Sequence, residues 1–176
     1  MPTALLRALP TAVLAFATAA TPALSQEGVG TVTGTLDLAD ARWIVAGPGE
    51  GPSSSWRRTD GTYRIRLVAT PGAGGGTGAG TLTIEIVAET GATEVRATQA
   101  SVALAGAGRD YRASPENVDL TLTAAEPEGG DIAVTGSFQA TLTPGGAEGL
   151  VVETEAGRTI DGDFQATVPA AEDGAA

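Results

Sequence analysis

The sequence contains no cysteine, no histidine and no lysine. The chain therefore forms no disulfide and has no lipobox cysteine for a lipid anchor. A Ser-His-Asp triad, a Cys-His pair and a Ser-Lys dyad are excluded, and zinc, haem and copper sites lose their usual ligands. Carboxylate chemistry remains, such as the acid pair of a glycosidase. We therefore expect a protein that is not an enzyme and that uses no cofactor.

Positive charge and aromatic residues are also scarce. Ten arginines stand against 21 acidic residues, and the formal net charge is −11. Such an acidic surface repels nucleic acid and anionic lipid, so we expect no nucleic-acid partner. Aromatic residues make up 4% of the chain, too few for the girdles of an outer-membrane barrel, and most expected strands are too short for one. We expect no membrane insertion of the mature chain, and an aromatic-lined glycan cleft is disfavoured as well.

The N-terminal segment has the three-part layout of a secretory signal peptide. Arg7 precedes an apolar stretch, and small residues follow up to Ser25. This layout predicts a signal peptide over residues 1–25, cleaved between Ser25 and Gln26. The mature protein is then periplasmic or secreted. We expect one domain over residues 26–169 and a disordered tail over residues 170–176.

The mature chain alternates polar and apolar residues in short runs, with turn residues between them, which is the pattern of β-strands. About nine or ten strands result, and we expect an antiparallel β-sandwich, Ig-like or jelly-roll-like, with a small closed β-barrel as the alternative. The predicted strands are Thr31–Leu38, Ala41–Ala46, Ser54–Thr59, Tyr63–Ala69, Thr81–Ile86, Val95–Leu104, Val118–Thr123, Ile132–Leu142, Leu150–Glu155 and Thr159–Val168.

Two of these strands repeat one phrase, Gly-x-Phe-Gln-Ala-Thr, at Gly136 and at Gly162. On strand alternation the glycine and the phenylalanine of each copy share the buried face. A buried glycine beside a phenylalanine predicts that an aromatic ring lies over the bare backbone of a neighbouring strand. We interpret the copies as two core strands built alike, with Leu150–Glu155 as the candidate strand that joins them.

Residues 56–66, WRRTDGTYRIR, hold four of the ten arginines. Asp60-Gly61 between two strands predicts a two-residue type I′ turn. The turn sets Arg57 opposite Arg64 and Trp56 opposite Ile65. It also brings Arg58 over Tyr63, where a cation–π contact is expected.

One face of this hairpin carries Arg57, Arg64 and Arg66. Because like charges opposed across a sheet are unfavourable, we expect anions beside them. The anions are either carboxylates of this protein or an external ligand held by the guanidinium groups. The candidate binding site therefore comprises these three arginines, with Trp56 and Tyr63 as anchors of the hairpin.

Two further charged segments are candidates for a role. Arg109–Arg112 is interpreted as part of a loop that could join the arginine hairpin in one patch. Asp161 and Asp163 lie two residues apart on the solvent side of a strand. They are a weak calcium candidate set against ordinary solvated charge.

The sequence as a whole predicts an exported, non-catalytic binding or envelope-interaction module. Its partner would be an anionic glycan or another envelope protein. One alternative is a structural or assembly subunit of a surface complex that pairs through an edge strand. Another is a carboxylate-based glycan hydrolase.

Overall fold

The computed structural model describes residues 28–49, 51–74, 79–90, 95–106, 109–145 and 157–171. The predicted signal peptide 1–25 and the predicted strand Leu150–Glu155 lie outside these ranges. None of the helical structure described is long and apolar enough to cross a membrane. The elements are β1 (Gly28–Leu36), β2 (Ala39–Ala46), β3 (Ser55–Thr59), β4 (Thr62–Pro71), β5 (Thr81–Thr90), β6 (Val95–Gly106), β7 (Arg109–Ala113), a single 3-10 turn η1 (Pro115–Asn117), β8 (Val118–Glu128), β9 (Asp131–Pro144) and β10 (Arg158–Pro169).

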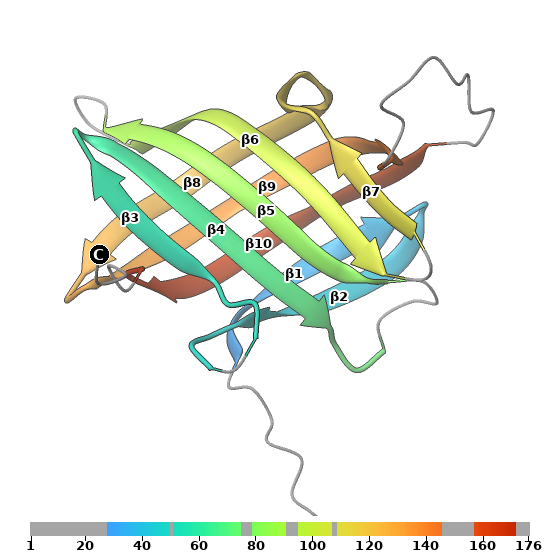
Figure 1. Cartoon of the computed structure of the whole chain (residues 1–176), viewed down its shortest axis with the longest axis horizontal. Coiled ribbons are helices and arrows are strands. Elements are labelled where there is room, and N and C mark those ends of the chain that lie inside the picture. Colours follow the sequence, from blue (N-terminus) through green and yellow to red (C-terminus); the bar gives the residue numbers. More distant parts are fainter. Residues whose placement is uncertain are drawn as a thin grey trace, which may run out of the picture.

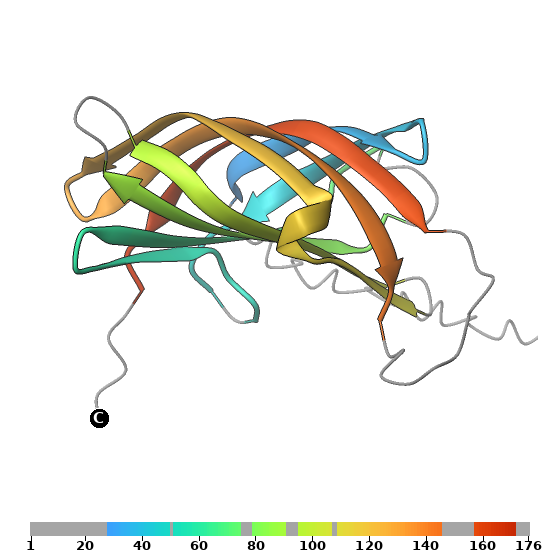
Figure 2. The ribbon, with the colours of Figure 1, turned by 90° about the horizontal axis from the view of Figure 1, so that it is seen from above.

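The strands form one antiparallel sheet that closes on itself. Its order is β10-β1-β2-β4-β5-β6-β7-β9, and β9 pairs with β10 again to complete the ring. The ring is flattened, with β3 to β7 lying in front of β8, β9, β10, β1 and β2 (Figures 1 and 2). The predicted all-β fold is confirmed. The two packed layers resemble a sandwich, and the hydrogen bonds at both sides make it a small closed barrel.

Two positions in the ring are each filled by a pair of successive strands. β2 pairs with the C-terminal end of β4, and β3 pairs with its N-terminal part. On the other side of the ring, β7 and β8 both pair with β9. Each pair is one interrupted strand, so the ring has eight positions although ten strands are described.

The prediction that Arg109–Arg112 lies in a loop is wrong, because these residues belong to β7. They pair with β6 and, through Tyr111 and Arg112, with β9. Three of the four side chains are charged, and only Tyr111 and the following Ala113 are shielded from solvent. Five residues with so little apolar content give no alternation to detect.

The strands also extend further than the alternation predicted. β8 continues through Ala124–Glu128, beyond the end of the predicted strand Val118–Thr123, and pairs there with β9 as far as Asp131. A register shift between Leu122 and Ala124 interrupts the alternation. The polar, proline-containing sequence after this bulge therefore does not look like a strand, although its backbone remains in the ladder.

The inside of the ring is filled by apolar side chains, while the outward positions carry mainly threonine, arginine, glutamine and acidic residues. This alternation is what a sheet with one buried face requires. Burial of the aliphatic and aromatic side chains is the main stabilising contribution. The largest fully buried side chains are Trp43, Phe164, Ile65, Leu67, Leu82, Ile84, Ile86, Leu104, Ile132, Leu142, Ile160 and Val32.

The repeated phrase marks the two strands that close the ring. Phe164 of β10 faces Gly136 of β9 in register, and Phe138 faces Gly162. A Cβ atom on Gly136 would lie 2.6 Å from Cζ of Phe164, which places the ring over bare backbone as predicted. The two strands pair directly, however, and not through Leu150–Glu155.

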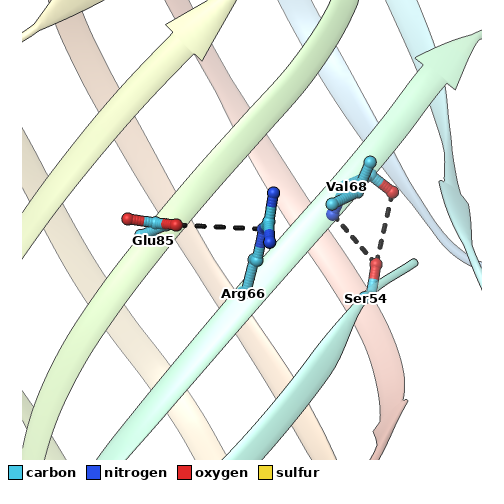
Figure 3. Close-up of polar contacts among 4 residues, drawn as sticks. All are labelled: Ser54, Arg66, Val68 and Glu85. Carbon is cyan, nitrogen blue, oxygen red and sulfur yellow. Dashed lines mark hydrogen bonds and ion pairs between the residues drawn. The ribbon is translucent and has the colours of Figure 1, made fainter. Parts of the chain in front are cut away.

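Ser54 is the one buried polar residue among those described. Its hydroxyl accepts a hydrogen bond from the Val68 N–H at 2.9 Å and donates to the Val68 carbonyl at 3.2 Å (Figure 3). Val68 lies between the part of β4 that pairs with β2 and the part that pairs with β3. Neither β2 nor β3 pairs with Val68, so the Ser54 hydroxyl supplies the hydrogen bonds that a strand partner would otherwise make there.

Replacing Ser54 by alanine is expected to lower the free energy of unfolding by about 2 kcal/mol, because the buried Val68 N–H and carbonyl lose their partner. Urea denaturation followed by Trp fluorescence measures the change. Ser53→Ala, one residue earlier and only partly buried, is the matched control and should stay within about 0.5 kcal/mol of the wild type. Equal stability of the two variants would contradict the bridging role.

The β1–β2 connection differs from the predicted strand Thr31–Leu38, since β1 ends at Leu36 and Asp37-Leu38 forms a two-residue turn. Both turn residues have positive φ, 53° and 69°, as a type I′ turn requires. The Asp37 carboxylate accepts hydrogen bonds from Arg158 Nε at 2.7 Å and from the Thr159 N–H at 3.0 Å. Leu38 is 89% exposed and holds a conformation that disfavours a side chain with a Cβ.

We expect Leu38→Gly to stabilise the protein by about 0.5 kcal/mol, because relief of the left-handed strain exceeds the entropy lost by glycine on folding. Thermal unfolding by circular dichroism measures the shift. Gly61 occupies the same turn position between β3 and β4 at φ 82°, and a Cβ there meets no atom within 4 Å. Gly61→Ala should therefore lower the melting temperature through backbone strain alone. If the melting temperature changed in the same direction in both variants, left-handed strain at this turn position would not be the cause.

Candidate functional site

The arginine hairpin folds as its sequence predicted. Asp60 and Gly61 have φ values of 50° and 82°, which confirms the type I′ turn. Arg57 pairs with Arg64, and Trp56 pairs with Ile65. The register is thus fixed by a two-residue turn whose conformation only a few residue types adopt readily.

The inner face of the hairpin is an aromatic stack closed by a cation. Tyr63 is 4% exposed. The ring of Trp56 stacks on it with centroids 6.0 Å apart at 28°, and the guanidinium of Arg58 lies 5.3 Å from the Tyr63 centroid. The predicted cation–π contact is therefore confirmed, and it is worth about 0.5–1 kcal/mol at an exposed site. The stack holds β3 and β4 against the interior of the barrel.

On the outer face the three arginines differ in their surroundings. Nε of Arg66 lies 3.8 Å from Oε1 of Glu85 (Figure 3), and both side chains are more than half exposed, so the pair contributes at most about 1 kcal/mol. Arg57 and Arg64 face each other across the ladder. Within the described residues neither has an ion pair with a carboxylate. A carboxylate of the protein itself therefore balances the charge of Arg66, whereas no such carboxylate is ion-paired with Arg57 or Arg64 in the described part of the chain.

These arginines line a pocket of about 350 Å³ on the outside of the sheet. Trp56, Arg57, Arg64 and Arg66, four of the five predicted site residues, are in its wall. Tyr63 lies behind the wall, beneath Trp56. The remaining lining residues are Ser55, Ile65, Glu85, Ile86, Val87 and Ala171.

One side of the pocket is built by the chain that leaves β10. Ala170 forms a parallel bridge with Trp56, and the Ala171 N–H donates to the Trp56 carbonyl at 2.7 Å. The indole Nε1 of Trp56 donates to the Gly130 carbonyl of the β8–β9 turn at 3.1 Å. Trp56 thus joins three separate parts of the chain. Ala170 and Ala171 were assigned to the tail that follows Pro169, and their small side chains without a pattern gave no signal of this contact with β3.

The second arginine cluster does not join the pocket. β7 is separated from β4 by β5 and β6, and Arg112 pairs with Ala103 of β6. Sequence reasoning also missed Arg158, which lies 5.5 Å from the centroid of Tyr111 and holds the Asp37 carboxylate. Arg158 of β10 thus contacts both Tyr111 of β7 and Asp37 of the β1–β2 turn, and these contacts stabilise the barrel.

One of the two acidic residues of β10, Asp161, has a hydrogen-bond partner. The Thr35 hydroxyl donates a hydrogen bond to Oδ1 of Asp161 at 2.7 Å, and Asp163 stands opposite Thr33 of β1 and Ser137 of β9. The described part of the chain contains no group of three or more His, Cys, Asp or Glu side chains arranged to hold a metal ion. Among the described residues, the calcium candidate Asp161 and Asp163 therefore has no third acidic side chain beside it.

The chain was compared with protein-family models, with curated proteins and with solved structures, and none of the three comparisons gives a match. Its functional interpretation therefore depends on the geometry of the pocket and on the sequence.

Replacing Trp56 by phenylalanine keeps an aromatic ring on Tyr63 and removes the hydrogen bond to Gly130. We expect a loss of about 1 kcal/mol in the free energy of unfolding, measured by urea denaturation with Trp43 as the remaining fluorophore. Faster amide hydrogen exchange at Ala171 should accompany the loss, because the neighbouring wall of the pocket is released. Unchanged exchange at Ala171 would show that Trp56 does not hold this wall.

Proposed function

We propose that this protein is an exported, non-catalytic binding module that takes an anionic ligand in the pocket between β3 and β5. One observation carries the proposal. Arg57 and Arg64 oppose each other at a pocket of about 350 Å³ and have no ion-paired carboxylate among the described residues. The exported location rests on the sequence of residues 1–25.

The chemistry of the pocket suits an oxyanion. Two like charges directly opposed cost free energy in a sheet, and a bound anion removes that cost. Guanidinium groups bind carboxylate, sulfate and phosphate oxygens through paired, charge-assisted hydrogen bonds. Val87, which stands opposite Arg64 on the outward face of β5, also lines the pocket and can contact the apolar body of a ligand. An acidic sugar unit combines both features.

The hydrolase alternative is weaker, because a glycosidase needs two carboxyl groups about 5–10 Å apart. Glu85 is the single acid in the described wall of the pocket, and it is paired with Arg66. The assembly alternative is favoured by one feature, the edge of β3 that faces away from β4. Among the described residues this edge has no strand partner apart from the bridge at Trp56. Edges of this kind can accept a further strand.

Binding of sulfate and of sulfated or uronic-acid oligosaccharides, measured by calorimetry at two salt concentrations, tests the proposal. We expect Arg57→Gln/Arg64→Gln to raise the Kd about tenfold or more, because charge-assisted hydrogen bonds are lost. The wild-type Kd should rise with salt, since the site is exposed. Arg112→Gln, at an exposed arginine of β7 outside the pocket, is the control and should bind like the wild type.

Two results would reject the anion site. One is the absence of binding to every anion tested. The other is an equal loss in the pocket variant and in the Arg112 control, which would indicate attraction by overall charge. Concentration-dependent oligomers that form without an added anion would favour assembly through the edge of β3.

A further inference from the structure

The pocket that takes the anion also has a carboxylate in its wall. Glu85 is the one acidic side chain among the described residues that line it. It lies on the outward face of β5 opposite Arg66 of β4, and its Oε1 is 3.8 Å from Nε of Arg66 (Figure 3). A carboxylate weakens the attraction of a wall for anions. The position of Glu85 therefore constrains which anions the pocket accepts.

The ladder sets the outward side chains of the pocket in two rows across β3, β4 and β5. The first row consists of Arg57, Arg64 and Val87, and the second row consists of Ser55, Arg66 and Glu85. Residues two apart on one strand are separated by about 7 Å, which is the distance between the rows. The first row is basic and apolar, whereas the second row contains both charges and a hydroxyl group.

The first row binds an anionic oxygen, because the guanidinium groups of Arg57 and Arg64 donate hydrogen bonds and accept none. The second row has different chemistry, because the carboxylate of Glu85 only accepts hydrogen bonds. Its distance of 3.8 Å from Nε of Arg66 is too long for a hydrogen bond between these atoms. Both side chains of the pair are more than half exposed, so a ligand can reach them. The second row therefore suits a hydroxyl group and repels a second anion.

We propose that Glu85 is a specificity-determining residue, which makes the pocket select a ligand with a single anionic group and with hydroxyl groups about 7 Å from it. A hexuronic acid unit has this layout, since its carboxylate and its hydroxyl groups lie at opposite ends of one sugar ring. A sugar with an anionic group at both ends lacks the donor that Glu85 needs. This inference rests on the proposed function of the Arg57–Arg64 pocket, and it narrows the ligand class from oxyanions to singly charged sugar acids.

Two ligands that differ by one anionic group test the inference. Methyl glucuronide has one carboxylate, and a sulfate ester of the same glucuronide replaces one of its hydroxyl groups by a second anion. Calorimetry at low salt measures both Kd values for the full chain. We expect the wild type to bind methyl glucuronide more tightly by about three- to tenfold, because two charges about 7 Å apart at an exposed site repel each other by that factor.

The variant Glu85→Gln removes the charge and keeps the shape of the side chain. It should reduce the preference for methyl glucuronide about fivefold or more, because the repulsion is lost and the hydrogen bond to the hydroxyl group is no longer charge-assisted. Glu89→Gln is the matched control. It makes the same charge change at an exposed position of β5 that does not line the pocket, and its preference should equal that of the wild type.

The side-chain Nε–H signals in nitrogen-15 spectra show which arginines the ligand contacts. Methyl glucuronide should shift the signals of Arg57 and Arg64 in the wild type. In Glu85→Gln the sulfate ester should also shift the signal of Arg66, because this guanidinium then has no carboxylate beside it. An Arg66 signal that the sulfate ester shifts equally in the wild type would contradict the exclusion by Glu85.

The outcomes separate this inference from the proposed function. An unchanged preference in Glu85→Gln, with binding that Arg57→Gln/Arg64→Gln abolishes, would overturn the role of Glu85 and keep the anion site. Equal changes in the Glu85 and Glu89 variants would also overturn it, because overall charge would then decide the preference. Binding of neither ligand to the wild type would reject the proposed function and the inference with it.

Discussion

The ladder between β9 and β10 is the contact on which the rest of the barrel depends. It runs from Leu142 opposite Arg158 to Asp131 opposite Pro169, and it turns an open meander into a ring. The ring of Phe164 can lie over the backbone of β9 because its partner in the ladder, Gly136, has no side chain at that position. Without this closure β9 and β10 would each expose an unpaired edge, and the apolar inner face would be open to water at that side.

Two positions of the closed ring are interrupted. β4 and β9 are long strands that pair with two shorter ones each, and the break opposite β4 is bridged by the hydroxyl of Ser54. The interruption releases β3 from β2, so its outer edge is free to meet the chain after Pro169. The pocket therefore exists because one strand of the ring was divided.

Local signals in the sequence predicted the arginine hairpin well. Asp60-Gly61 fixes the turn, and with a period of two it fixes every residue pair up to Trp56 and Ile65. The phrase around Gly136 and Gly162 likewise predicted the stacked ring. The wall at Ala171 was missed because its partner, the carbonyl of Trp56, is distant in the sequence. β7 and the end of β8 pair with strands that are next to them in the sequence, but the charged side chains of β7 and the bulge after Leu122 hide the alternation that would predict a strand.

The joining of Trp56 with Ala170 and Ala171 has a consequence for the order of events during folding. The arginines are contributed by the first half of the sequence, and the opposite wall comes from the residues that follow the last strand. Contacts between such distant segments form late, because the loop between them must be ordered first. The pocket is therefore complete only in a chain that has closed its barrel, so the formed pocket reports that folding is finished.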